Sequence, residues 1–129
     1  MNEVTDVSRG PQSLDMFDLK RMLKALGDEA RLHMLSLLAE VGETNVTDLS
    51  LLLEARWRFV SQPLVSWHIS VLRRIGFVRT RRIGRLVYCS LDRARYDGCL
   101  RMLSELTLPG APRGTEPQIA DVTPARTAR

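Results

Sequence analysis

Apolar side chains recur every three or four residues in five stretches of the chain, which is the spacing of amphipathic helices. Each stretch opens at a Ser, Thr or Asp whose side chain can accept a hydrogen bond from a first-turn amide, and most of them end at Gly or Pro. With these caps included, the pattern predicts helices over residues 13–26, 28–40, 47–55, 61–75 and 92–108.

Two of these helices carry apolar positions that we expect to face the core, and a third carries an apolar stripe. In the helix at 28–40 they are Leu32, Met34, Leu35, Leu37, Leu38 and Ala39. In the helix at 61–75 they are Leu64, Val65, His68, Ile69 and Leu72. The apolar stripe of the helix at 92–108 is Tyr96, Cys99, Leu100, Leu103 and Leu106. The short helix at 47–55 lies before the helix at 61–75 at the spacing of a helix-turn-helix pair, in which the first member supports the second.

The pattern then changes to two short runs of β-forming residues, 77–81 and 86–90. The link between them, 82–85, contains Gly84, so the two runs predict a β-hairpin with glycine at its turn. Residues 44–47 are expected to be a connector. A helix-turn-helix followed by a hairpin predicts a mainly α, winged helix-turn-helix fold of about five helices and a two-stranded wing.

The helix at 13–26 is apolar around more than one narrow stripe, and such a helix on the outside of a small domain needs two partners. We expect one partner to be the core of the domain and the other to be a second copy of the chain. The helix at 92–108 should share this surface, because neither helix is needed to complete the helix-turn-helix. The residues expected at the dimer interface are Leu14, Phe17, Met22, Tyr96, Leu100 and Leu103.

The chain has 129 residues, 44% of them hydrophobic, which is enough for one domain with a buried core. Residues 1–12 have no periodicity and are expected to be a flexible arm. Residues 109–129, rich in Pro, Gly, Ala and Thr, are expected to be a disordered tail, which leaves 13–108 as the domain. No apolar run approaches the ~20 residues of a membrane span and no leader pattern opens the chain, so we expect a cytoplasmic protein without a membrane partner.

The net charge of +4 hides an asymmetry along the chain. Residues 1–60 hold seven Lys or Arg and ten Asp or Glu, residues 61–101 hold nine Arg and two Asp, and residues 102–129 balance at three each. Clustered arginine is typical of phosphate binding, because neutralised phosphates release their counterions. Charge alone is equally compatible with a solvated basic surface.

The outer face of the helix at 61–75 has hydrogen-bonding groups and arginine but no acidic residue. A capped helix with such a face, followed by an arginine-tipped hairpin, can fill a major groove and hold the neighbouring phosphates. His68 has two interpretations, a core histidine, which is the more usual, or a base contact. The candidate DNA-binding residues are Ser61, Gln62, Pro63, Ser66, Trp67, His68, Ser70, Arg73, Arg74, Arg79, Arg81, Arg82 and Arg85.

The turn between the two helices of the pair, 54–60, is longer than a tight turn needs. Trp57 and Phe59 are expected to pack back on the domain, with base stacking as the alternative. Arg56 and Arg58 could reach phosphate.

Two segments carry a family resemblance. One is LKALGDEARLHMLSLLAE, which begins at Leu23 and contains the turn DEARL; the other is SQPLVSWHISVLRRIGFVRTRRIGRLVYCSLD, which begins at Ser61 and contains the wing pattern RxGRxVYxSL. Together they resemble the ArsR/SmtB family of bacterial dimeric winged-helix repressors, and the likeness covers about residues 14–108.

The resemblance implies a homodimer that binds double-stranded DNA at an inverted repeat, usually near its own promoter, and leaves DNA when an effector binds. The residues that fill the family's Ser-Gln-x-x-Val-Ser-x-His run are Ser61, Gln62, Val65, Ser66 and His68. By this match Gln62 and Ser66 are base or phosphate contacts, and Pro63 and Trp67 can contact a thymine methyl. The chain departs from the family in its longer turn at 54–60.

Effector chemistry departs further. Many members sense a metal through Cys-x-Cys in the third helix, where this chain has Asn45, Val46, Thr47 and Asp48. Others use Asp and His on the last helix, which here has Asp92, Arg93, Arg95 and Asp97 and no histidine. Thiolate and imidazole are the ligands of such metals, so we expect neither metal site and no cofactor, and the effector stays unidentified. Cys89 and Cys99 are expected to be buried thiols, with a thiol-sensor pair or a metal site as alternatives.

The leading hypothesis is a homodimeric, sequence-specific transcriptional repressor. The alternative, from another class, is a winged-helix protein-interaction module whose basic face meets an acidic partner. An enzyme is not expected, because the sequence has neither a recognisable nucleophile and base motif nor a glycine-rich phosphate loop.

Overall fold

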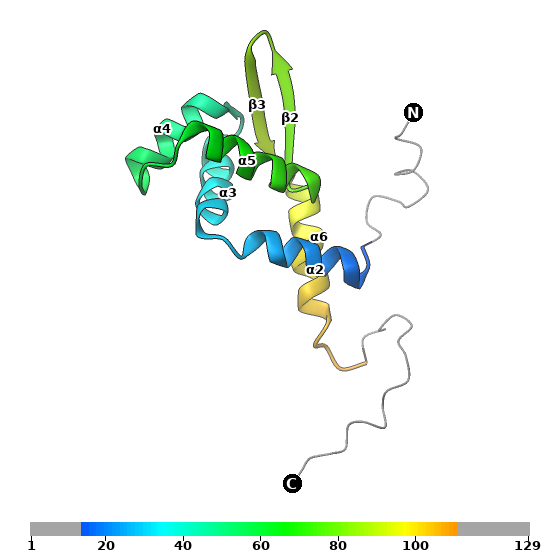
Figure 1. Ribbon diagram of the computed structural model, residues 1–129. Helices are drawn as coiled ribbons and strands as arrows, with labels where there is room; N and C mark the ends of the chain where they lie inside the picture. Colours follow the sequence, from blue (N-terminus) through cyan, green and yellow to red (C-terminus); the bar gives the residue numbers. More distant parts are fainter. Residues whose placement is uncertain (1–13, 111–129) are drawn as a thin grey trace.

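The computed structural model describes residues 14–110, and within them the chain forms five helices and three strands (Figure 1). In chain order the elements are α2 (Met16–Leu26), α3 (Glu29–Val41), β1 (Thr44–Asn45), α4 (Val46–Arg56), α5 (Gln62–Arg74), β2 (Val78–Ile83), β3 (Leu86–Leu91) and α6 (Arg93–Glu105). The five predicted helices and the hairpin are therefore confirmed, with ends that shift by a few residues. The predicted arm, the cap at residue 13 and most of the predicted tail lie outside the described residues.

Side-chain caps set the starts of the helices. Asp28, Ser61 and Asp92 cap α3, α5 and α6 as predicted, each accepting a hydrogen bond from the amide three residues later. α2 begins with a reciprocal pair in which Asp15 accepts from the amide of Asp18 and the Asp18 side chain accepts from the amide of Asp15. The cap of α4 is Asn45, so this helix begins two residues before the predicted start at residue 47.

The sheet has one strand more than the sequence pattern indicates. β2 and β3 form the predicted antiparallel hairpin, with Ile83 opposite Leu86 and Gly84 at φ 62° in the two-residue turn. The expected connector at 44–47 is wrong, because Thr44 and Asn45 form β1, and Val46 and Thr47 begin α4. β1 pairs antiparallel with β3 and gives the order β1-β3-β2. A two-residue strand is too short to leave a period-two pattern, and its partner lies far along the chain.

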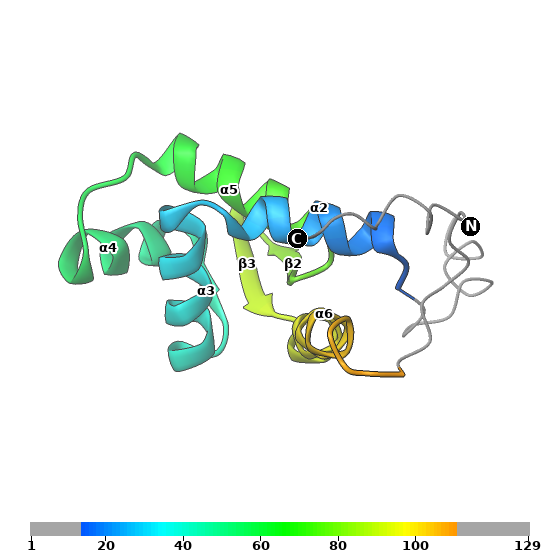
Figure 2. The ribbon, with the colours of Figure 1, turned by 90° about the horizontal axis from the view of Figure 1, so that it is seen from below.

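The hairpin projects from the helical body beside α5 (Figure 1). α5 and the hairpin lie on one side of the molecule, and α2 crosses α6 at the end away from the hairpin tip (Figures 1 and 2). The DNA-reading elements predicted from the sequence and the predicted dimer helices therefore occupy different parts of one body.

The core receives side chains from every helix and from β2 and β3. Its fully buried members are Met22, Met34, Leu38, Leu49, Leu53, Val65, Leu72, Phe77, Val78, Cys89 and Cys99. Three of the predicted core positions are wrong, since Leu32, Ala39 and Leu64 are exposed. On α3 the buried position beside Leu32 is occupied by the side chain of Arg31. The apolar stripe of each of these helices is thus wider than the part of the helix surface that the core buries.

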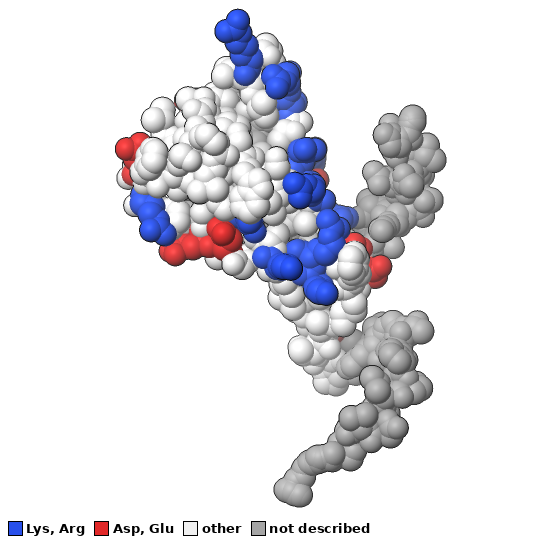
Figure 3. All heavy atoms as spheres, in the orientation of Figure 1, with Lys and Arg blue, Asp and Glu red and all other residues white. Residues whose placement is uncertain are grey.

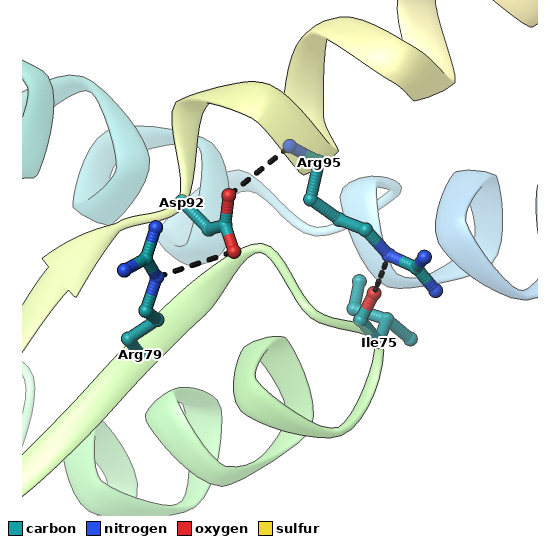
Figure 4. Close-up of polar contacts among 4 residues, drawn as sticks. All are labelled: Ile75, Arg79, Asp92 and Arg95. Carbon is teal, nitrogen blue, oxygen red and sulfur yellow. Dashed lines mark hydrogen bonds and ion pairs between the residues drawn. The ribbon is translucent and has the colours of Figure 1, made fainter. Parts of the chain in front are cut away.

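Asp92 joins α6 to the hairpin (Figure 4). One carboxylate oxygen accepts from the amide of Arg95, and the other accepts from Nε of Arg79 on β2 at 3.2 Å. The Arg95 side chain crosses Gly76, which has φ 89°, and donates to the carbonyl of Ile75 at the end of α5. α5, the hairpin and α6 are therefore held together at one junction.

Candidate nucleic-acid interface

The outer face of α5 is exposed and free of acidic groups. Of the predicted candidates on this helix, the exposed ones are Gln62, Pro63, Ser66, Trp67, Arg73 and Arg74, and Ser70 is half-buried. The inner face buries Val65, Ile69 and Leu72. The amphipathic division predicted for this helix is therefore present, and hydrogen-bonding side chains and two arginines face solvent.

The first turn of α5 is fixed by two contacts. The Ser61 hydroxyl accepts a hydrogen bond from the Leu64 amide at 3.4 Å. Nε2 of Gln62 donates to the hydroxyl of Thr47 on α4 at 2.7 Å, which ties the two helices of the pair together. Sequence reasoning missed Thr47 because its partner lies 15 residues away. The Gln62 amide is thus oriented before any ligand arrives.

His68 does not belong to the outer face, so its inclusion among the DNA contacts is wrong. Its side chain is only 4% exposed, and its Nδ1 accepts a hydrogen bond from Nε of Arg31 at 3.0 Å. Burial lowers the pKa of His68, an effect that Asp28 opposes and Arg31 reinforces. The core interpretation of this histidine is confirmed.

Arg31 is a buried cation that links three helices. Besides the bond to His68, a second guanidinium nitrogen donates to the carbonyl of Ala25 in the last turn of α2 at 3.0 Å. The guanidinium also lies 5.2 Å from the ring centroid of Trp67, whose other side is open to solvent. No sequence signal marked Arg31, because its partner on α5 is 37 residues away.

Arginines extend along the hairpin to its tip. Figure 3 shows Lys and Arg side chains from the tip downwards along one edge, whereas the surface over α4 and the first turns of α5 is mostly uncharged. Arg82 and Arg85 at the tip are exposed and have no ion pair within the described residues. Their neighbours at the tip are the exposed apolar residues Ile83 and Leu86.

The two arginines nearer the base of the hairpin are ion-paired. Arg79 contacts Asp92, and Arg81 makes two hydrogen bonds to Glu43, at 2.7 and 2.8 Å. Arg81 lowers the pKa of Glu43, so this carboxylate is charged at neutral pH. Glu43 follows α3 and was not among the predicted residues. Arg79 and Arg81 are thus part of the predicted basic surface but are already partly neutralised.

The α4–α5 turn agrees with the sequence prediction for one aromatic residue and not for the other. Trp57 packs on the domain, stacked on His33 with ring centroids 4.2 Å apart, and Arg58 covers it at 4.4 Å. Phe59 is 68% exposed, so its expected packing is wrong. Arg56 makes two hydrogen bonds to Glu40 at 3.0 Å and lowers its pKa.

Both cysteines are fully buried, as expected for small hydrophobic side chains. Burial raises the pKa of Cys89 to about 11, and its thiol donates to the carbonyl of Thr44. Burial also raises the pKa of Cys99. Because the thiolate is the reactive form, these environments do not favour the thiol-sensor alternative.

The predicted dimer residues divide into two groups. Phe17, Leu100 and Leu103 are exposed apolar side chains on α2 and α6. Met22 is only 1% exposed and belongs to the core, so it is wrongly assigned, and Tyr96 is half-buried against Phe77. An open apolar hollow of about 510 Å³ lies beside α2, lined by Met16, Leu19, Lys20, Leu23 and Lys24.

Two features are absent from residues 14–110. None of these residues form a cluster of three or more His, Cys, Asp or Glu side chains suited to a metal ion. In the same range, no helix is both long and apolar enough to cross a membrane.

Known proteins resemble this chain in sequence and in fold. The family described as bacterial regulatory protein, ArsR family, matches residues 28–80, from the cap of α3 into β2. The arsenical resistance operon repressor of Escherichia coli is 38% identical over 72 residues, 56% of this chain and 57% of the relative. The transcriptional activator HlyU of Vibrio cholerae is 34% identical over 85 residues, 66% of this chain and 73% of HlyU. The chain spans little more than half the length of the first curated relatives it matches.

Solved structures agree with these matches. HlyU from Vibrio cholerae gives a TM-score of 0.52 at 32% identity, covering 70% of this chain and 91% of HlyU. A homodimeric winged helix-turn-helix DNA-binding domain from Mycobacterium bovis gives a TM-score of 0.55 at 24% identity, covering 69% of this chain and 79% of that domain, and it shows the same fold. The matched relatives are transcriptional regulators rather than enzymes. On its sequence and its winged helix-turn-helix, this chain belongs to the ArsR family of bacterial regulatory proteins.

Proposed function

We propose that this regulator is a homodimeric, sequence-specific DNA-binding repressor whose α5 helices enter successive major grooves of an inverted repeat. The observation that carries the proposal is the exposed, acid-free face of α5 beside a hairpin whose tip arginines form no ion pair with any other described residue. In this proposal Gln62 and Ser66 meet base edges, which is supported by their position on the outer face of the first turns of α5. Arg82 and Arg85 hold backbone phosphates, which carry no sequence information.

The dimer is proposed from the apolar surface on α2 and α6. Phe17, Leu100 and Leu103 remain exposed, and a single domain gains nothing from keeping such side chains in water. The Mycobacterium bovis domain of the same fold is homodimeric. Two copies related by a two-fold axis would present two α5 helices to half-sites about 34–36 Å apart. Leu103→Glu should shift the mass in solution toward the monomer and weaken DNA binding with it.

DNA binding is tested by selecting duplexes from a random library with the full chain and measuring affinity by fluorescence anisotropy. Gln62→Ala and Ser66→Ala should mainly reduce discrimination between the selected and a scrambled duplex. Arg82→Gln and Arg85→Gln should weaken both duplexes equally, and each should lower the salt slope by about one per subunit, or about two for the dimer. Arg93→Gln, which removes an arginine paired with Asp97 on α6, is the matched control. Failure to enrich any duplex, together with stoichiometric capture of an acidic protein, would favour the interaction module instead.

Repression follows from occupancy of a promoter by a small dimer, and the Escherichia coli relative is an operon repressor. HlyU is named as an activator, so the sign of regulation needs its own test. A reporter behind the selected site should fall when the wild-type chain is expressed and recover with Gln62→Ala. A reporter that rises instead would make the protein an activator with the same DNA-binding face. The same reporter can be used to screen for an effector that releases the protein.

A further inference from the structure

A hollow of about 250 Å³ lies between α5, the start of α4 and the hairpin. The residues that line it are Val46, Ser66, Ile69, Ser70, Arg73, Thr80 and Val87. Its polar groups are three hydroxyls and one guanidinium, and no carboxylate lines it. Hydroxyl donors beside a single arginine form a set that suits a phosphate oxygen rather than a cation.

The polar groups of this hollow have no partners among residues 14–110. Ser66, Ser70 and Arg73 follow one another at four- and three-residue spacing, so they form one stripe of α5. Thr80 adds a hydroxyl from β2. None of the four side chains makes a hydrogen bond or ion pair within the described residues. By contrast, the Ser50 hydroxyl on α4 donates to the carbonyl of Val46 at 3.0 Å, the usual arrangement for a helical serine.

The hollow lies where a backbone strand of duplex DNA would pass between α5 and the hairpin. α5 and β2 are in contact, and the hairpin rises beside α5 (Figure 1). When a helix occupies a major groove and the neighbouring hairpin reaches the adjacent minor groove, the phosphodiester strand that separates these grooves passes between the two elements. That strand would cross the molecule at the hollow.

We infer that this hollow binds one phosphodiester group of the DNA backbone, with Arg73 supplying the charge and Ser70 and Thr80 donating hydroxyl hydrogen bonds to the phosphate oxygens. The inference rests on the proposed DNA-binding function and adds Thr80 to the contact set. Because residues of α5 and of the hairpin contact the same phosphate, the site fixes the distance between these two elements on DNA. It contributes affinity but no sequence preference.

The test uses the full chain, the selected duplex, and a set of duplexes in which single phosphates are replaced by uncharged methylphosphonates. Ser70→Ala and Thr80→Val should each weaken binding to every sequence by about 10-fold or more, the range for a hydrogen bond to a charged acceptor, without changing the salt slope. Arg73→Gln should lower the slope by about one per subunit, or about two for the dimer. Thr80→Ser keeps the hydroxyl and should bind like the wild type, and Ser36→Ala on the exposed side of α3 is the matched hydroxyl control.

The decisive result is a loss of additivity at one phosphate. On the duplex that lacks charge at the contacted phosphate, Ser70→Ala and Thr80→Val should bind like the wild type, whereas on all other duplexes their losses should persist. Losses that persist on every methylphosphonate duplex, or wild-type affinity of both variants for the selected duplex, would overturn the inference while leaving the proposed function intact. The inference would also be overturned by variants that lose affinity for inorganic phosphate, measured by amide chemical shifts, but keep their affinity for DNA. A wild-type chain that binds no duplex would overturn both.

Discussion

Neutral His68 should make the stability of this protein depend on pH. Its Nδ1 accepts the hydrogen bond from Arg31, so the bond exists only while that nitrogen carries no proton. Burial lowers the pKa of His68 below its ordinary value of 6.5, which means that the unfolded chain takes up a proton before the folded one does. The stability that this site contributes is therefore fully present above pH 6.5 and is lost as the pH falls from 6.5 toward the lower folded-state pKa.

The size of the effect follows from the cost of leaving a buried donor without its partner. His68→Leu leaves Nε of Arg31, a residue only 9% exposed, without its acceptor, and should lower the free energy of unfolding by about 2 kcal/mol. For a domain of this size that loss corresponds to a fall of about 8–16 °C in Tm. His68→Asn brings an amide oxygen close to the position of Nδ1 and should recover about half of the lost free energy of unfolding.

Urea unfolding followed by circular dichroism at about pH 7.5 and about pH 5.5 measures this effect. His33, the other histidine, lies 3.6 Å from Glu29, so all variants are made in a His33→Gln background and compared at one protein concentration. The parent should lose stability between the two pH values, and His68→Leu, already destabilised, should lose clearly less. Equal losses in both proteins would refute the reasoning, because the titrating group would then lie elsewhere.

Three further predictions concern other parts of the molecule. Glu43→Gln, which removes the negative charge beside Arg81, should tighten binding to all duplexes in anisotropy titrations, and unchanged affinity would count against a role for this arginine. Cys89, whose pKa is about 11, should react with Ellman's reagent only at the rate at which the protein unfolds, and rapid modification would revive the thiol-sensor alternative. Gly76→Ala places a Cβ 2.7 Å from Nε of Arg95 at φ 89° and should lower the free energy of unfolding by about 1–3 kcal/mol in urea titrations, a loss that Arg95→Ala should relieve only in part.

Features determined by neighbouring residues could be predicted from the sequence, and features determined by distant ones could not. Helix starts at Asp28, Ser61 and Asp92 depend on a side chain three residues from its partner amide, so the sequence pattern contains both partners. The strand β1 and the bond between Arg31 and His68 join segments 45 and 37 residues apart, and nothing local marks either of them. The polar face of α5 was predictable because helical periodicity alone divides its two sides.

Exposure was the weakest part of the prediction, and the reason is geometric. Leu32 and Leu64 continue apolar stripes by spacing, yet both lie at an edge that the core of one domain does not reach. The assignment of Met22 to the dimer failed in the opposite direction, because α2 directs this side chain into its own domain. The sequence determines the angle between side chains around a helix axis. Only the packed structure shows which part of the helix surface the rest of the domain buries.

The charge of the sequence also overstates the charge available for phosphates. Residues 61–101 carry nine Arg, yet Arg79 and Arg81 near the hairpin base are occupied by Asp92 and Glu43. The arginines of α5 and the hairpin without an ion pair in the described part of the chain are Arg73, Arg74, Arg82 and Arg85. If each meets one phosphate, the slope of log affinity against log salt should be about −3.6 per subunit and about −7 per dimer, against about −11 if the two paired arginines contributed as well. A slope near the larger value would mean that DNA displaces the two carboxylates, and Glu43→Gln would then leave the slope unchanged while raising the affinity.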